Sequence, residues 1–423
     1  GTIANTATIT NVVFNDNDGI GFQVNVFGHI NLNTVSASNN TDSGGVMDNC
    51  QWNGSNCDGS GNITFNSATS NSFNDNGYYG AVMSTGGVVK ITNINANRNI
   101  NTGVYINASS GFGNVTVQNP AANVLNTISQ NGYYGIEINA NGVITVNKIN
   151  AENNNSANIL LYTTSTAGNS VTLTNSKANG SVNNTGFYIY AGGGATIKSI
   201  TASNNFNRGG FIENGANLNT LVTTSIFKDN GFYGLEVNSN GNVTLNGITV
   251  SGNNDVGLRI NNNTGTGKVE LLSTLGENLI NNNTLHGLQI TTAGNVTLSK
   301  VTAMDNGFSG IHITSSGGTG IVSLNTVLAK NNGHTGIYVF TTGKITVTKT
   351  VSLNNGQSNN TDGIYANTSS SDGVTISNSY FIGNAGSGIE INVVDPLTMV
   401  FITNTAYLGN DSNNNGDLDL NVY

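Results

Sequence analysis

The sequence predicts an all-β fold in which short parallel strands wind into a solenoid. One phrase recurs throughout the 423 residues: a Gly, an apolar residue, any residue and a second apolar residue. Val, Ile and Thr are spread evenly through the chain, and these residues favour β-strands. No stretch shows the 3.6-residue apolar period of an amphipathic helix. Together these observations favour a repeat architecture over a globular one.

The recurring phrase marks the first strand of each coil. Clear copies start at Gly135, Gly234, Gly257, Gly287, Gly310, Gly336 and Gly388. Weaker copies start at Gly21, Gly45, Gly80, Gly103, Asn158, Gly186, Gly209 and Gly363. This predicts about 15 coils of about 26 residues each, a length typical of solenoid repeats.

Each coil is predicted to contain three short strands. In one coil these are residues 234–237, 242–245 and 247–250, followed by a turn of Ser, Gly and two Asn. Apolar and polar residues alternate along the strands, so each strand should bury one side and expose the other. Asn-Gly and Asn-Asn pairs in the turns suit residues that tolerate a left-handed backbone. Stacked coils would share a core that no single coil could form.

Composition limits the domain organisation and the partners. The Gly, Asn, Thr and Ser content is uniform, so we expect residues 1–423 to form one continuous solenoid. The net charge is −9, and no basic stripe indicates nucleic-acid binding. No apolar run approaches the roughly 20 residues of a membrane helix. We therefore expect neither a nucleic-acid partner nor a membrane span.

The two cysteines lie close together in a polar segment. Cys50 and Cys57 are separated by Gln, Trp, Asn, Gly and Ser residues, which suit a loop. Two cysteines that close a short loop favour a local disulfide formed in an oxidising compartment. We expect a disulfide-closed loop insertion near residues 48–60 and an extracellular or cell-surface location. Two reduced thiols remain the alternative.

The repeat pattern resembles the right-handed parallel β-helix repeat family. This superfold includes pectate lyases, polygalacturonases and many giant bacterial surface proteins. The resemblance covers nearly the whole chain and implies a single right-handed parallel β-helix. In texture the chain is similar to the Asn-, Gly- and Thr-rich surface solenoids of bacteria. Because a fold does not determine function, the resemblance carries less information about activity.

Stacked first strands would align one outward residue from each coil in a column about 4.8 Å apart. The predicted column is Gln23, Met47, Val82, Tyr105, Glu137, Leu160, Tyr188, Phe211, Glu236, Arg259, Gln289, His312, Tyr338, Tyr365 and Glu390. In the pectate-lyase-like enzymes the corresponding sheet lines the sugar cleft. The resemblance therefore implies a glycan-binding face, for which the candidates are Glu236, Arg259, Gln289, His312, Tyr338 and Tyr365. The alternative is an ordinary set of cross-strand neighbours.

The sequence favours no catalytic, metal or cofactor site. Glu236 and Arg259 form the one adjacent pair of opposite charge in the column, and a surface ion pair is the simpler interpretation. Glycoside hydrolysis needs two carboxyl groups roughly 5 to 9 Å apart, yet no two acidic residues neighbour each other in the column. The four His are scattered along the sequence, which disfavours a metal site.

The leading hypothesis is an extracellular structural solenoid, such as an adhesin stalk, a sheath or a fibre subunit. A carbohydrate-active enzyme (a polysaccharide lyase or glycoside hydrolase) and a carbohydrate-binding module are the alternatives, with a cell-surface or matrix polysaccharide as the ligand. Strand-like sequence at residues 6–14 and 416–423 would leave unpaired strand edges. We therefore expect end-to-end self-association of copies, or of neighbouring segments of a longer chain.

Overall fold

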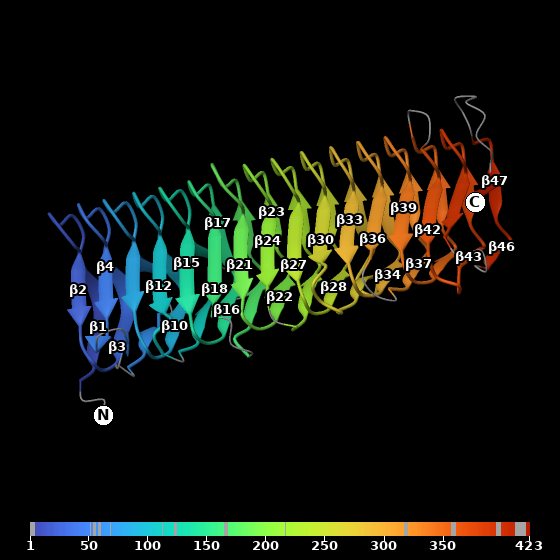
Figure 1. Ribbon diagram of the computed structural model, residues 1–423. Coiled ribbons are helices and arrows are strands. Elements are labelled where there is room, and N and C mark those ends of the chain that lie inside the picture. Colours follow the sequence, from blue (N-terminus) through green and yellow to red (C-terminus); the bar gives the residue numbers. More distant parts are fainter. Residues whose placement is uncertain are drawn as a thin grey trace. The chain divides into compact units, whose positions relative to one another are not determined.

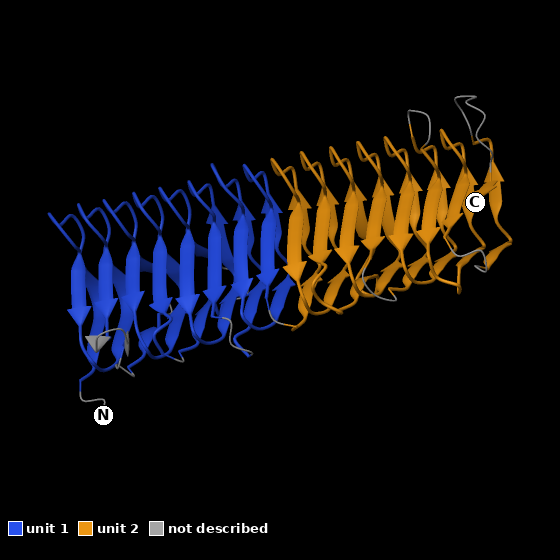
Figure 2. Ribbon diagram, viewed as in Figure 1, with its two compact units in different colours: residues 1–216 blue, residues 217–423 orange. Residues whose placement is uncertain are grey.

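The computed structural model describes residues 5–423 apart from 51, 54–55, 58–60, 68, 112, 122–124, 165–167, 216, 317–319, 357–360, 395–398 and 411–419. The chain divides into two compact units, residues 1–216 and 217–423 (Figure 2). Every regular element in the described residues is a β-strand, as the ribbon in Figure 1 shows. No described helix is long and apolar enough to cross a membrane.

In each unit the first strands of successive coils form one parallel sheet (Figure 1). In unit 1 these strands are β2 (Phe22–Asn25), β4 (Gly45–Asp48), β9 (Ala81–Ser84), β12 (Val104–Ala108), β15 (Ile136–Ala140), β18 (Ile159–Thr163), β21 (Phe187–Ala191) and β24 (Gly210–Asn214). In unit 2 they are β27 (Leu235–Ser239), β30 (Leu258–Asn262), β33 (Leu288–Thr292), β36 (Ile311–Ser315), β39 (Ile337–Thr341), β42 (Ile364–Thr368), β45 (Ile389–Val393) and β48 (Leu420–Val422).

The second and third strands of each coil also pair in parallel with their counterparts in the next coil. In unit 1 they are β1 (Ala7–Val13) and β3 (Ile30–Ser36), which each span both positions, then β7 (Ile63–Phe65), β8 (Asn71–Ser72), β10 (Val89–Thr92), β11 (Ile94–Asn95), β13 (Val115–Gln118), β14 (Asn126–Thr127), β16 (Ile144–Asn147), β17 (Ile149–Glu152), β19 (Val171–Thr174), β20 (Lys177–Asn179), β22 (Ala195–Lys198) and β23 (Thr201–Ser203).

In unit 2 the second and third strands alternate along the chain. They are β25 (Thr220–Thr223), β26 (Ile226–Lys228), β28 (Val243–Asn246), β29 (Thr249–Ser251), β31 (Val269–Leu272), β32 (Asn278–Asn281), β34 (Val296–Ser299), β35 (Val301–Met304), β37 (Val322–Asn325), β38 (Leu328–Lys330), β40 (Ile345–Thr348), β41 (Val351–Leu353), β43 (Val374–Ser377), β44 (Tyr380–Ile382), β46 (Val400–Thr403) and β47 (Ala406–Leu408).

This architecture confirms the predicted all-β solenoid with three short strands per coil. A first strand starts at every predicted position except one. Phe22 pairs with Gly45, so the residue equivalent to Gly21 is Gly44 and not Gly45. The prediction missed this because two glycines stand side by side. As a result Met47 points inward, where it is fully buried, and Val46 occupies the outward column. The single continuous solenoid over residues 1–423 stays a prediction.

The core of each unit is formed by the alternating apolar residues of the three strands. Ile136 and Ile138 flank the outward Glu137, and both are fully buried. The same pattern repeats from coil to coil, so that like residues stack on like residues. Burying a Leu, Ile or Val side chain stabilises the folded state by about 1.5–3 kcal/mol relative to leaving it exposed. The apolar positions of the recurring phrase therefore determine which residues point outward.

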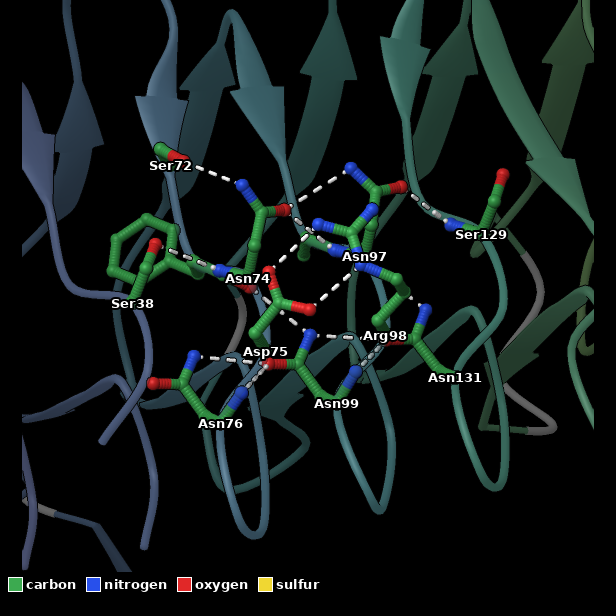
Figure 3. A network of polar contacts seen from close by, with 12 residues as sticks. Ser38, Ser72, Asn74, Asp75, Asn76, Asn97, Arg98, Asn99, Ser129 and Asn131 are labelled. Atoms are coloured by element: carbon green, nitrogen blue, oxygen red, sulfur yellow. Dashed lines mark hydrogen bonds and ion pairs between the residues drawn. The ribbon is translucent and has the colours of Figure 1, made fainter. Parts of the chain in front are cut away.

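Asparagines, nearly all of them buried, connect neighbouring coils at the turns before most of the first strands. Asn99 is typical: its Nδ2 donates to Phe73 O at 3.0 Å and to Asn131 Oδ1 at 2.9 Å. Its backbone N–H donates to the same oxygen, and its own Oδ1 accepts from Asn76. Figure 3 shows this part of the network. We call these residues the asparagine ladder; they are Asn40, Asn76, Asn99, Asn131 and Asn154 in unit 1, and Asn230, Asn253, Asn283, Asn306, Asn332, Asn355, Asn384 and Asn410 in unit 2.

The ladder corrects the interpretation of the Asn-Gly turns. The left-handed residue is the one before the ladder asparagine, for example Asp75 with φ 58° and Arg98 with φ 56°. In most Asn-Asn turns this is the first Asn, as predicted, but before Asn253 it is Gly252, and in Asn76-Gly77 neither residue is left-handed. A Cβ on Gly77 would lie 2.1 Å from Thr41 O, so glycine is needed there because the coils approach closely.

Candidate functional site

The first-strand face is the outward side of the first-strand sheet in either unit. In unit 2 the six candidate residues occupy adjacent strands of this face. Each of them is the register partner of the next, in the order Glu236, Arg259, Gln289, His312, Tyr338 and Tyr365. The structure thus places all six in one column, as the repeat predicted. Their role in ligand binding stays a prediction.

The charged end of this column is more buried than a surface ion pair. Arg259 Nη1 lies 3.3 Å from Glu236 Oε1, and the side chain of Glu236 is only 7% exposed. The same Nη1 donates to the hydroxyl of Tyr233 at 3.0 Å, and the guanidinium lies over the Tyr233 ring. Tyr233 belongs to the turn before β27 and was not among the candidates. Arg259 is therefore engaged by Glu236 and Tyr233. Fewer of its N–H donors are available to a ligand.

The aromatic part of the column forms a stack of nearly parallel rings. His312 and Tyr338 have ring centroids 4.5 Å apart with planes at 10°, and Tyr338 and Tyr365 are 5.0 Å apart at 8°. Tyr338 is covered on both faces by its neighbours. A sugar stacks on a free aromatic face. Tyr338 has none, so it can offer a ligand only its ring edge and its hydroxyl group. We call His312, Tyr338 and Tyr365 the ring ladder.

Three histidines that are far apart in sequence gather beside the ring ladder. The ring of His286 lies 4.8 Å from those of His312 and Phe308, and Phe308 stacks on His334 at 4.3 Å. Histidines that are scattered along the sequence therefore become neighbours in space, because residues one coil apart lie side by side. Burial, followed by the nearby His312 and His334, lowers the pKa of His286 to about 4. Burial also lowers the pKa of His312 and of His334.

A pocket of about 420 Å³ lies at the far end of the ring ladder in unit 2. His334, Tyr338 and Tyr365 line it together with the carboxylates of Asp362 and Glu390. Asp362 is nearly buried, and its Oδ1 accepts from the backbone N–H of Ser387 at 3.0 Å. Sequence reasoning missed Asp362 because it lies in the turn before β42, outside the column. The pocket therefore contains two carboxyl groups, one from the column (Glu390) and one from a turn (Asp362).

Unit 1 carries a second group of aromatic residues, which the candidate list missed. Tyr162 and Tyr190 are cross-strand partners with centroids 6.1 Å apart and planes at 49°. Tyr190 is in turn the partner of the exposed Glu213. The three residues line a pocket of about 230 Å³. Tyr162 is 44% exposed, while Tyr190, which also lies beside Tyr188 and Phe211, is half-buried. The sequence signal that could have found this group is tyrosine at alternate positions of one strand, as in Tyr188 and Tyr190, which places both side chains on the outward face.

Another pocket in unit 1 combines the turn tyrosines with a carboxylate. Tyr79, Ile100, Tyr133 and Glu137 contribute to a pocket of about 350 Å³. Glu137 Oε1 accepts from Asn139 Nδ2 at 2.9 Å, and burial raises the pKa of this carboxyl. Tyr79 and Tyr133 come from two copies of the Asn-Gly-aromatic-Tyr-Gly turn, in its second and first aromatic position respectively. The turn motif therefore supplies aromatic surface as well as a close approach of the backbone.

Cys50 and Cys57 form a disulfide, with an S–S distance of 2.07 Å. The residues between them include the short antiparallel pair β5 (Trp52–Asn53) and β6 (Asn56–Cys57). In the described part of the chain, no group of three or more His, Cys, Asp or Glu residues could hold a metal ion. The three gathered histidines thus do not form such a site.

Comparison with known proteins agrees with the fold. A family model described as the right-handed β-helix region matches residues 159–327 and 269–416. These matches cover more than half of the chain, and the chain belongs to this family. The match also bears out the predicted handedness. A search of curated protein sequences gives no match.

Among solved structures, the chain is similar to the A-module of the mannuronan C-5 epimerase AlgE4 from Azotobacter vinelandii. The sequences are 12% identical, with 86% of this chain and 91% of the module covered and a TM-score of 0.30. A likeness at this level carries no information about the reaction or the substrate of this chain.

Proposed function

We propose that this protein is an extracellular β-helical scaffold that binds a polysaccharide along its first-strand face. The observation that carries the proposal is the tilted pair Tyr162 and Tyr190 beside Glu213. Partly uncovered tyrosine faces next to a planar acceptor match the two sides of a sugar ring, which has an apolar C–H face and polar edges. Stacked coils repeat such positions about every 4.8 Å, which suits a polymer.

The scaffold role rests on the frame of each unit. The asparagine ladder and the buried apolar columns hold the outward side chains in a regular array. Sites on strands are placed more precisely than sites on loops. A disulfide between Cys50 and Cys57 is typical of oxidising compartments, which supports a location at the cell surface or in a matrix. End-to-end stacking of copies into a fibre belongs to the same proposal.

Binding of polysaccharides to the whole chain tests this function. A glycan array should detect a ligand, and Tyr162→Ala with Tyr190→Ala should weaken its binding by about tenfold or more, since each buried aromatic contact is worth about 1 kcal/mol. Tyr380→Ala is the matched control, because Tyr380 is exposed on β44, away from the first-strand face. Equal loss in both variants, or the absence of any glycan ligand, would contradict the proposal.

A carbohydrate-active enzyme is the second candidate, favoured by Asp362 and Glu390 in one pocket of unit 2. Two carboxyl groups facing a sugar are the usual machinery of glycoside hydrolysis. Asp362 is already engaged by the backbone of Ser387, which argues for a structural role and places this candidate second. Release of reducing or unsaturated ends from a polysaccharide, abolished by Glu390→Gln, would reverse the order.

A further inference from the structure

We propose that the bound polysaccharide carries amino groups, so that the first-strand face recognises a cationic amino-sugar polymer. This inference rests on the proposed function and narrows its ligand class. A protonated amine would lie against a carboxylate of the face, while the C–H side of the same or the next sugar would pack on a tyrosine.

The first argument is that three pockets share one chemistry. The pockets of about 230, 350 and 420 Å³ are each lined by at least two tyrosines and at least one carboxylate. None of the three is lined by Lys or Arg. An acidic sugar would need a cationic partner in such a pocket, because burying an unpaired carboxylate is costly. A cationic sugar finds its partner in every one of them.

The register of unit 1 gives the second argument. Tyr162, Tyr190 and Glu213 are successive register partners, so they lie on three adjacent coils in one outward column. The backbone of Glu213 is therefore about 4.8 Å, one coil, beyond that of Tyr190. Glu213 is exposed and can accept hydrogen bonds from an ammonium group. A sugar stacked on Tyr190 would reach Glu213 with an amine at its edge.

The carboxylate of Glu137 gives the third argument. It lies among Tyr79, Tyr105 and Tyr134, and burial raises its pKa, so its charged form lacks full solvation. A cation close by would stabilise that charged form. Asn139 occupies one oxygen of the carboxylate through a single hydrogen bond. The pocket is thus better suited to an ammonium group than to a neutral hydroxyl group.

The arginines of the face are engaged elsewhere. Arg259 is held by Glu236 and by the hydroxyl of Tyr233. Arg208 lies over the ring of Phe211, 5.5 Å from its centroid; it is near enough for its charge to act on the pKa of Tyr190, although it does not line the pocket. With a net charge of −9, the chain also attracts cations and repels polyanions at long range. The face therefore disfavours uronate polymers.

The test is calorimetric titration of the whole chain with three hexasaccharides. A β-1,4-linked glucosamine hexamer at mildly acidic pH carries ammonium groups, and its fully N-acetylated form has the same backbone without charge. A galacturonate hexamer is the anionic probe. We expect the glucosamine hexamer to bind about tenfold more tightly than the acetylated one, and galacturonate more weakly than both. Added salt should reduce the difference.

Charge-matched variants separate a site from general attraction. Glu137→Gln with Glu213→Gln should remove most of the preference for the amine while keeping side-chain volume. Glu152→Gln with Glu270→Gln makes the same change in net charge on strands β17 and β31, outside the first-strand face, and should leave the preference intact. Equal loss in both double variants would overturn the inference.

The outcomes also separate this inference from the proposed function. Equal binding of the glucosamine and acetylated hexamers, or tight binding of galacturonate, would overturn the amino-sugar assignment and leave polysaccharide binding standing. A panel of neutral, acidic and amino polysaccharides that all fail to bind would overturn both.

Discussion

The two units carry their paired tyrosines in different outward columns of the first-strand sheets. In unit 1 Tyr162 and Tyr190 are 6.1 Å apart and tilted by 49°, and the ring of Tyr162 is largely exposed in the pocket that also contains Glu213. In unit 2 Tyr338 and Tyr365 are 5.0 Å apart at 8°, so that the faces cover each other. Tyr162 and Tyr190 occupy the fourth position of their strands, two residues after the position that Tyr338 and Tyr365 hold in theirs. The two pairs therefore differ in column as well as in tilt, and we propose that the less covered pair is the one that binds glycan.

The largest expected effect tests what the two units share. Asn99 in unit 1 and Asn306 in unit 2 are fully or almost fully buried and make matching sets of hydrogen bonds along the asparagine ladder. Replacing either by Ala leaves several buried polar atoms without partners. We expect each variant to lose about 3–5 kcal/mol of unfolding free energy.

Chemical denaturation measures this loss, and Asn263→Ala is the control. Asn263 is exposed and lies outside the ladder, so its replacement should change stability by less than about 0.5 kcal/mol. Similar losses for Asn99→Ala and Asn306→Ala would show that the units differ only on their outward faces. A much smaller loss in one unit would show that their frames differ as well.

The second effect is a dependence of unit 2 on pH. Because the pKa of His286 is lowered to about 4, the unfolded chain binds a proton more readily than the folded one between pH 6.5 and 4. Stability is therefore greatest above pH 6.5 and falls as the pH decreases towards 4. For a group that is partly exposed we expect a loss of about 2 kcal/mol from His286, with smaller losses from His312 and His334.

Hydrogen exchange of peptides from each unit would measure this difference. Protection in unit 2 should decrease with acidification as these histidines are protonated. In His286→Phe, which keeps a ring against Phe308, the decrease should be smaller by the contribution of that histidine. An unchanged pH profile in this variant would show that the environment of His286 does not control the acid response.

The smallest effect addresses the ring ladder directly. Tyr338→Ala removes two stacked contacts, so we expect a loss of about 1–2 kcal/mol in stability. Tyr190→Ala removes contacts with Tyr162, Tyr188 and Phe211, so we expect a similar loss of stability together with weaker glycan binding. Thermal unfolding and glycan binding would be measured for both variants. Loss of glycan binding in Tyr338→Ala but not in Tyr190→Ala would contradict the assignment of the glycan face to unit 1.

Much of the frame could be predicted from the order of residues. The recurrent Gly and the alternation of apolar and polar residues identified the first strands and nearly all of the outward column. The miss at Gly44 and Gly45 has a simple cause, since either glycine can begin the phrase. Only the pairing of Phe22 with Gly45 shows that Val46, and not Met47, points outward.

The candidate site could be predicted only in part. The positions of Glu236, Arg259, Gln289, His312, Tyr338 and Tyr365 followed from the period. The cluster of His286, Phe308 and His334 did not, because these residues lie in the turns before the first strands and outside the column. Asp362 was missed for the same reason, although it lines a pocket together with Glu390.

The sequence by itself determined the solenoid, the three strands of each coil and, outside β4, the side on which the residues of the first strands lie. The coil repeat and the alternation of apolar and polar residues can be read from the sequence. Because the apolar residues must be buried, this alternation determines which side of a strand faces the core. Only the tertiary structure decided the tilt of each ring, the engagement of Arg259 by Glu236 and Tyr233, and the meeting of tyrosines with carboxylates in pockets. These depend on contacts between residues one coil apart, where a small rotation of a side chain covers or opens a face.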